Sequence, residues 1–187
     1  MSVDGIKLLT NLIKKTSVEK ASIKTAIPGL FLVLSLLSSP SWALNSDSQQ
    51  PMELVADRAE LDDQKGISTY SGRVTLTQGT LELKGDTLII RSVGGEPQLI
   101  TTIGKPGKFK QRPEDKPDDI IATATTIKYD VAKEKIVLDG NALLIQGNQR
   151  FSGAHITYDM TTDKVKAIGA VGAESGGRVH MTLPGKQ

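Results

Sequence analysis

Apolar and polar residues alternate with a period of two along most of the chain after residue 50. In the stretch 74–84, threonine, glutamate and lysine separate the apolar residues Val74, Leu76, Leu81 and Leu83. Successive side chains of a strand point to opposite faces, so this pattern predicts strands with one apolar face. The pairs Gln78-Gly79 and Gly147-Asn148 are typical of turns between such strands. We therefore predict an all-β fold for residues 44–187.

An internal repeat organises the alternating region. The segment 56–62 aligns with 124–130 at an offset of 68 residues, and an offset of 29 residues nests inside it, from Ala56 to Gly85 and from Ala124 to Gly153. A repeat of this length is one supersecondary unit copied along the chain. It predicts short antiparallel strands in a rolled, jelly-roll-like pair of sheets, with an unpaired edge at each end.

Three local features mark where strands end or change direction. Aspartate recurs at strand ends, where it suits a turn-type bond to the backbone, at Asp62, Asp130 and Asp159. Residues 71–73 and 139–141 are breaks or bulges centred on glycine. Residues 105–119 do not fit the repeat, and their prolines and charges predict a solvated loop between the halves, with Phe109 as an apolar exception.

The N-terminal region has the features of an export signal. Five lysines precede an apolar run at 26–37, and Ser41-Trp42-Ala43 follows it. A basic segment, a short apolar segment and a small-x-small site predict a signal peptide over residues 1–43, cleaved after Ala43. A retained membrane anchor is the alternative interpretation, but a membrane-spanning helix needs about 20 apolar residues, and this run is shorter and contains Pro28-Gly29. Export places the remaining residues 44–187 in the periplasm.

Composition narrows the possible functions of this body. Residues 44–187 carry 18 basic and 19 acidic residues, so their net charge of −1 gives no electrostatic reason for nucleic-acid binding. There is no cysteine, and aromatic residues are only 4% of the chain, so the core must be aliphatic and held without disulfides.

Candidate catalytic groups are few. His155 and His180 are the only histidines, and neither stands at a metal-ligand spacing with another histidine. The adjacent carboxylates at 62–63 cannot converge on one substrate bond, because neighbours on a strand face opposite ways. The pairs at 114–115 and 118–119 lie in the predicted loop. The sequence therefore predicts a protein that is not an enzyme, with no metal and no cofactor.

The apolar strand faces are the remaining candidate for function. They would line the inside of a rolled sheet, with Met52, Leu54, Leu76, Leu81, Leu83, Phe109, Ile127, Tyr129, Leu144, Phe151, Ile156 and Tyr158. Such residues either fill a core or leave part of the interior as a slot for a long apolar ligand.

Three motifs carry a resemblance to a known family. They are Ala124–Asp130, Leu138–Gly147 and Gly153–Tyr158, with a first copy at 56–85, and Gly104-Lys105-Pro106 and Arg178–Pro184 add to them. The sequence resembles the OstA-like (LptA) family of periplasmic lipopolysaccharide-transport proteins over residues 51–184.

The resemblance implies an open, V-shaped β-jelly roll of sixteen antiparallel strands that binds lipid A acyl chains between its sheets. It implies a carrier that bridges the inner and outer membranes during outer-membrane assembly in Gram-negative bacteria. Copies would join head to tail, with an LptC-like protein at the N-terminal edge and an LptD-like outer-membrane protein at the C-terminal edge. The alternatives are a membrane-anchored LptC-like component and a structural β-repeat protein without a ligand.

Two sets of residues follow from this interpretation. We expect the lipid to be bound by Met52, Leu54, Leu76, Leu83, Phe109, Tyr129, Val131, Leu144, Phe151 and Ile156. We expect partners to dock at the strand edges formed by Met52, Glu53, Leu54 and Val55 and by Val179, His180, Met181, Thr182 and Leu183.

Overall fold

The computed structural model describes residues 47–114, 116–170 and 177–185. The expected signal peptide and its cleavage after Ala43 lie outside these residues. Within them the fold is all-β, as predicted, apart from one short 3-10 helix, η1 (Asp47–Gln49).

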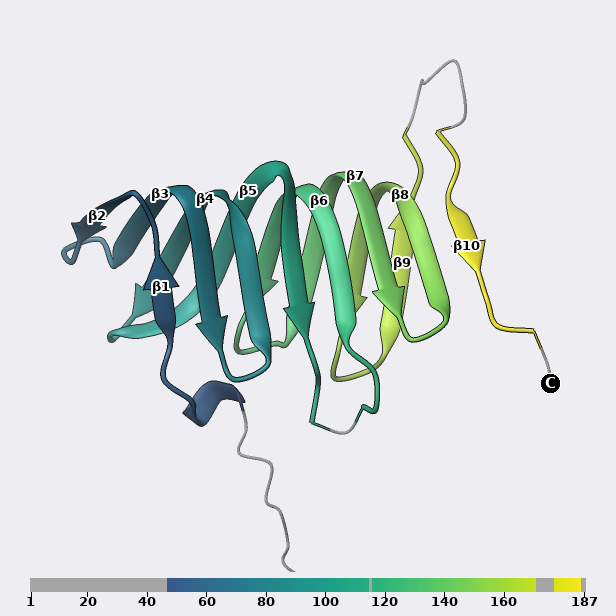
Figure 1. Ribbon diagram of the computed structural model, residues 1–187, viewed down its shortest axis with the longest axis horizontal. Helices are drawn as coiled ribbons and strands as arrows, with labels where there is room; N and C mark the ends of the chain where they lie inside the picture. Colours follow the sequence, from purple (N-terminus) through teal and green to yellow (C-terminus); the bar gives the residue numbers. More distant parts are fainter. Residues whose placement is uncertain (1–46, 115, 171–176, 186–187) are drawn as a thin grey trace, which may run out of the picture. The chain divides into compact units, whose positions relative to one another are not determined.

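The described residues form ten antiparallel strands in one sheet. They are β1 (Glu53–Val55), β2 (Arg58–Asp62), β3 (Ile67–Gln78), β4 (Leu81–Val93), β5 (Glu96–Gln111), β6 (Ile120–Asp130), β7 (Lys135–Gln146), β8 (Gln149–Asp159), β9 (Lys164–Ile168) and β10 (His180–Thr182). The order β1-β3-β4-β5-β6-β7-β8-β10 follows the sequence, while β2 also pairs with β3 and β9 with β8 (Figure 1). From β2 to β9, strands that are neighbours in sequence are therefore neighbours in the sheet, whereas β1 pairs with β3 and β10 with β8.

The sequence repeat corresponds to a repeat in the strands. β3 and β7 each have 12 residues, and the 68-residue offset carries the first and last residue of one onto those of the other. The same offset carries the start of β4, Leu81, onto the start of β8, Gln149. The internal repeat is therefore confirmed as a repeated strand pair.

All six long strands, β3 to β8, are interrupted near the middle by a shift in pairing register. In β3 the shift follows Ser71, and in β7 it follows Asp139, which confirms both predicted breaks. At these two breaks the backbone is left-handed at Gly72 (φ 83°) and Gly140 (φ 78°). Such bulges bend a strand, so we call this line of interruptions the crease.

The crease divides the sheet into two facing layers (Figure 1). The β1 layer contains β1, β10 and the half-strands 74–78, 81–84, 107–111, 120–123, 142–146 and 149–153. The β2 layer contains β2, β9 and the half-strands 67–71, 87–93, 96–103, 126–130, 135–139 and 155–159. The expected pair of sheets is thus one continuous sheet. When the two halves of each of the six long strands are counted separately, its ten strands become the sixteen that were expected.

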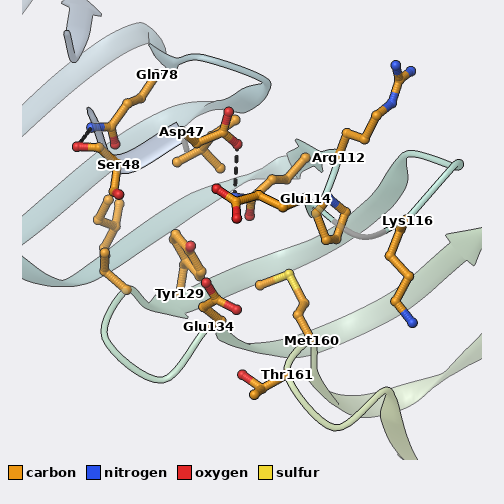
Figure 2. Close-up of a pocket in the computed structure, with 15 residues that line it drawn as sticks. Asp47, Ser48, Gln78, Arg112, Glu114, Lys116, Tyr129, Glu134, Met160 and Thr161 are labelled. Atoms are coloured by element: carbon orange, nitrogen blue, oxygen red, sulfur yellow. Dashed lines mark hydrogen bonds between the residues drawn. The ribbon is translucent and has the colours of Figure 1, made fainter. Parts of the chain in front are cut away.

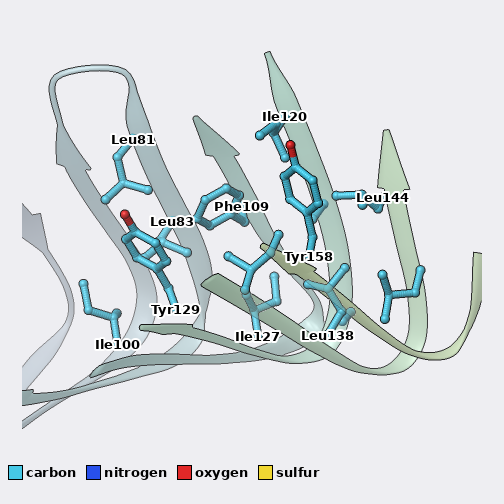
Figure 3. Close-up of a cluster of buried hydrophobic side chains, with 14 of the residues drawn as sticks. Leu81, Leu83, Ile100, Phe109, Ile120, Ile127, Tyr129, Leu138, Leu144 and Tyr158 are labelled. Carbon is cyan, nitrogen blue, oxygen red and sulfur yellow. The ribbon is translucent and has the colours of Figure 1, made fainter. Parts of the chain in front are cut away.

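One hydrophobic core fills the space between the layers. Both layers contribute to it, for example Leu83 and Leu144 from the β1 layer and Ile127 and Tyr158 from the β2 layer (Figure 3). All twelve residues expected to line the inside belong to this core or pack against it. The alternation of apolar residues therefore predicted the inner face correctly.

Three of the four turns of the β2 layer are held by the predicted aspartates. The Oδ1 atom of each aspartate accepts a hydrogen bond from the backbone N–H of the residue three positions later. The distances are 3.1, 3.1 and 2.9 Å for Asp62, Asp130 and Asp159. A left-handed residue then closes each turn of this layer, at Gly66, Gly95, Glu134 and Asp163. These turns lie at the rim opposite the crease.

The predicted loop at 105–119 is wrong over its first seven residues. Residues 105–111 belong to β5, whose pairing with β6 is interrupted between Ile103 and Gly107. Pro106 lies within this interruption, where a strand tolerates a residue that cannot donate a ladder hydrogen bond. Only residues after Gln111 connect β5 to β6, and Phe109 is fully buried rather than beside a loop.

Gly140, the left-handed glycine at the crease in β7, should contribute to the stability of the fold. We expect Gly140→Ala to lower the free energy of unfolding by about 1–3 kcal/mol, because the backbone conformation is strained for alanine. The new Cβ would also lie 2.8 Å from Thr125 Oγ1. Urea unfolding measures the loss.

Gly94→Ala is the matched control. Gly94 is also left-handed (φ 62°), but a Cβ there would meet nothing within 4 Å. Gly94→Ala should lower the free energy of unfolding only by the backbone strain of a left-handed alanine. An equal loss in both variants would therefore contradict a close approach between Gly140 and Thr125.

Candidate functional site

The structure brings the ten expected lipid-binding residues to the inside of the folded sheet. Seven are buried in the core: Leu76, Leu83, Phe109, Tyr129, Leu144, Phe151 and Ile156. Met52, Leu54 and Val131 are partly buried and pack against it. The set therefore forms one continuous apolar surface from the first strands to the last, although most of it is filled by its own side chains.

Phe109 and Tyr129 join the two layers at the middle of this interior. Their rings belong to opposite layers and meet edge to face, with centroids 5.5 Å apart and planes inclined by 67°. Burial of the Tyr129 hydroxyl raises its pKa to about 12. Tyr158, one repeat later, is also buried, which raises its pKa. Figure 3 shows both hydroxyl groups pointing the same way, toward the rim.

A cavity of about 440 Å³ opens between the rims of the two layers, opposite the crease (Figure 2). We call this opening the mouth. Its apolar wall is made by Leu81, Ile100, Tyr129, Val131 and Met160. Polar and charged residues surround the wall, namely Asp47, Ser48, Gln78, Gln111, Arg112, Glu114, Lys116, Glu134 and Thr161. An apolar wall with a charged rim is suited to an amphipathic molecule.

Two of the predicted lipid-binding residues, Tyr129 and Val131, line this cavity, and sequence reasoning missed three of their neighbours. Leu81 was placed inside the sheet but not at a site, and Ile100 and Met160 were not singled out. The repeat contains the signal for one of them, because the 29-residue offset carries Val131 onto Met160. No comparable signal marks Ile100.

The segment before β1 covers one end of the mouth. The Asp47 carboxylate accepts hydrogen bonds from the backbone N–H and the hydroxyl of Thr80, both at 2.6 Å. It also accepts one from Gln111 Nε2 at 3.1 Å (Figure 2). Gln78 Nε2 donates to the Gln50 carbonyl at 3.0 Å. These bonds attach η1 to the rim of the β1 layer.

Asp163 joins the two rims at the other end of the mouth. Its carboxylate accepts bonds from the Tyr158 hydroxyl at 2.7 Å and from Gln146 Nε2 at 3.1 Å, and it pairs with Lys116 Nζ at 2.9 Å. Lys116, Tyr158 and Gln146 together lower the pKa of Asp163 to about 2. Asp163 lies in a turn of the β2 layer, whereas Gln146 and Lys116 belong to the rim of the β1 layer.

Each end of the sheet presents strands that, among the described residues, pair on one side only. At the N-terminal end these are β1 and β2, and at the C-terminal end β9 and β10. The expected docking residues of both sets lie in or beside β1 and β10, and the expectation did not include the other two edge strands, β2 and β9. Large apolar side chains are exposed at these edges: Leu61 (61%), Ile168 (43%), Met181 (57%) and Leu183 (59%).

Groups with catalytic or metal-binding chemistry are sparse. No cluster of histidine, cysteine, aspartate or glutamate that could hold a metal ion occurs within residues 47–114, 116–170 and 177–185. His155 is a half-buried strand residue whose Nδ1 lies 2.6 Å from Asp139 Oδ1 and whose Nε2 lies 3.1 Å from Thr157 Oγ1. His180 is exposed on β10. In the same part of the chain no helix is long and apolar enough to cross a membrane.

These features define a class of protein: an antiparallel sheet folded at a crease, with an apolar interior that reaches from one open edge to the other. The sequence model described as LptA/(LptD N-terminal domain) LPS transport protein matches residues 53–164. The chain therefore belongs to this family.

Curated relatives and a solved structure agree with this assignment. The lipopolysaccharide export system protein LptH of Pseudomonas aeruginosa is 37% identical over 150 residues, covering 79% of this chain and 86% of that protein. The lipopolysaccharide export system protein LptA of Escherichia coli K12 is 34% identical over 158 residues, covering 82% and 83%. The crystal structure of LptH, described as a periplasmic component of the lipopolysaccharide transport device of P. aeruginosa, matches with a TM-score of 0.67 and 34% identity, covering 75% of this chain and 99% of that one.

The carboxylate of Asp163 should titrate far below an ordinary aspartate. Its folded-state pKa lies below the usual 3.8, so the ionised group stabilises the fold above about pH 4, and this contribution is lost as the pH falls toward 2. Carbon-detected NMR should give a midpoint near 2 for Asp163. Lys116→Gln should raise that midpoint toward 3.8, while Lys65→Gln, which removes an ion pair with Asp62, should not. An ordinary midpoint in the unaltered protein would refute the network.

Proposed function

We propose that this protein is a periplasmic carrier that binds the acyl chains of lipopolysaccharide between its two layers and passes the lipid from the inner toward the outer membrane. The observation that carries the proposal is the apolar interior, which extends from the β1–β2 edge to the β9–β10 edge. The family match and the names of the relatives support lipopolysaccharide as the cargo.

The hydrophobic effect explains why such an interior is needed. Each methylene group exposed to water costs roughly 0.8 kcal/mol, so an acyl chain of about ten methylenes costs roughly 8 kcal/mol. An aliphatic interior removes that cost for as long as the chain stays inside. The cavity at the mouth supplies an entry, with Tyr129 and Val131 on its wall.

The open edges support head-to-tail association, because the repeat specifies a register for it in the β2 layer. Within the chain, Ile100 pairs with Tyr129, and both are buried. The 68-residue offset carries Ile100 onto Ile168 of β9, and carried backward it takes Tyr129 onto Leu61 of β2. Continuing the sheet into a second copy would therefore cover Ile168 with the second copy's Leu61, and both are exposed in the single chain.

The β1 layer independently specifies the same register between copies. Met181 pairs with Phe151 as Phe109 pairs with Leu83 one repeat earlier. Because Phe109 also pairs with Ala122, and Leu54 is the repeat equivalent of Ala122, Met181 would meet Leu54 of the next copy. Strand direction also continues to alternate, so the joined sheet stays antiparallel throughout. Such a contact is heterologous and does not close on itself.

The same edges are the proposed docking sites for other components. We place an LptC-like protein at β1 and β2 and an LptD-like protein at β9 and β10. The family description groups LptA with the N-terminal domain of LptD, which supports an outer-membrane partner with a similar sheet edge. Backbone pairing at an open edge provides the affinity, and the apolar pairs provide the register.

Lipid binding is tested by native mass spectrometry of the purified protein with added lipopolysaccharide, which should yield a complex one lipid heavier. A photoreactive residue at Val131 should crosslink to the lipid. The same group at Ile121, exposed on the outer face of β6, is the matched control and should not. Absence of a complex, or equal crosslinking at both positions, would favour a structural β-repeat protein with a filled interior.

The register between copies is tested by disulfide crosslinking, since the chain has no cysteine of its own. Mixing Leu54→Cys with Met181→Cys should give a crosslinked dimer, because the two side chains share a face and lie opposite one another. Thr182→Cys mixed with Leu54→Cys is the control, since neighbouring residues on a strand face opposite ways. Crosslinking that is equal for both mixtures would reject the register.

A further inference from the structure

In the part of the chain that the structure describes, only one of the four rim turns of the β2 layer is bonded, through its left-handed residue, to the rim of the opposite layer. Each contains a left-handed residue at the equivalent place, Gly66, Gly95, Glu134 or Asp163. Two of these residues have no side chain, and Glu134 lines the cavity. Among the hydrogen bonds and ion pairs of the described residues, only Asp163 links its turn to the rim of the opposite layer.

The three partners of Asp163 come from separate elements. Gln146 is the last residue of β7, Lys116 lies in the connection between β5 and β6, and Tyr158 projects from β8 across the interior. The ring of Tyr158 is fully buried, so its hydroxyl reaches the rim from inside the core. One carboxylate therefore ties together the two layers and the core between them.

The mouth is therefore open along one part of its length and bridged by polar bonds along another. Above Tyr129 it holds the cavity of about 440 Å³. Above Tyr158, the equivalent tyrosine one 29-residue repeat later, the Asp163 network spans from one rim to the other. The low pKa of Asp163, about 2, keeps the carboxylate ionised and able to accept all three bonds at neutral pH.

We propose that Asp163, with Lys116, Gln146 and Tyr158, is a clasp that holds the two layers together over the C-terminal half of the interior and must release before an acyl chain can pass sideways through that part of the mouth. The cavity over Tyr129 is the standing opening, and the clasp controls the stretch beyond it. The part of this inference that concerns the acyl chain rests on the proposed carrier function, whereas the clasp itself is a property of the sheet.

Asp163→Gly is the most informative variant. Glycine adopts a left-handed backbone without strain, as Gly66 and Gly95 do in the equivalent turns, so the variant removes the clasp and keeps the turn. Glu134→Gly is the matched control, because it makes the same change in an equivalent turn without a bond to the opposite layer. Tyr158→Phe is a second test that removes only one hydroxyl bond of the clasp.

Spin labels measure the width of the mouth. Asn148 in the β7–β8 turn and Lys164 at the start of β9 are exposed and lie on opposite rims, and cysteines introduced there are unique in the chain. Double electron–electron resonance should show a longer and broader distance distribution for Asp163→Gly and a smaller change for Tyr158→Phe. Glu134→Gly should match the unaltered protein. An unchanged distribution in Asp163→Gly would overturn the clasp.

Lipid exchange is measured separately with fluorescently labelled lipopolysaccharide. Asp163→Gly should release and take up the lipid roughly tenfold faster, which corresponds to about 1.4 kcal/mol for the lost bonds. Lys133→Gln, which removes an ion pair with Asp130 inside one turn, should have no effect. A wider mouth with unchanged exchange would overturn the role in lipid passage. A wider mouth in a protein that binds no lipopolysaccharide would refute the carrier function and leave the clasp standing.

Discussion

The crease is the constraint on which the rest of the structure depends. An antiparallel ladder holds neighbouring strands in register, so one strand cannot bend sharply unless its neighbours bend at the same level. All six long strands shift register near their middle, and glycines adopt left-handed conformations at the crease in β3 and β7. The alignment of these shifts turns one sheet into two facing layers. The interior and the mouth both follow from that single fold line.

The repeat explains why the two edges of the sheet carry exposed apolar residues at complementary positions. Each strand pair buries its apolar residues against the next pair, so a sheet of finite length leaves one unsatisfied apolar row at each end. Leu61 at one end and Ile168 at the other stand at the positions that a buried pair, Tyr129 and Ile100, occupies inside the chain. The exposed side chains are therefore half-contacts of the repeat itself, which distinguishes them from apolar residues scattered on a surface.

The sequence was informative wherever a short-range pattern reflects a local physical rule. Alternation predicted the inner face, including Leu76 and Leu144, and the recurring aspartates predicted the turns. The strand at 105–111 was missed because proline and lysine are typical of loops, and only the interrupted pairing with β6 makes Pro106 acceptable in a strand. The network of Lys116, Gln146 and Asp163 was beyond sequence reasoning, since its members belong to different elements and follow no shared spacing. Their contact exists only because the crease brings the two rims together.

A filled interior is compatible with a carrier because of where the sheet is strong and where it is weak. Protein interiors are close-packed, so an acyl chain enters only if the layers separate. Separation by rotation about the crease leaves the ladder within each layer intact, since pairing is already interrupted along that line. The contacts that resist rotation are core packing, which the incoming chain replaces with equally apolar contacts, and the polar bonds across the mouth. Those bonds are worth about 0.5–1.5 kcal/mol each, and exposed ion pairs contribute less. Burying an acyl chain of ten methylenes yields roughly 8 kcal/mol, so binding can open the mouth without unfolding the sheet.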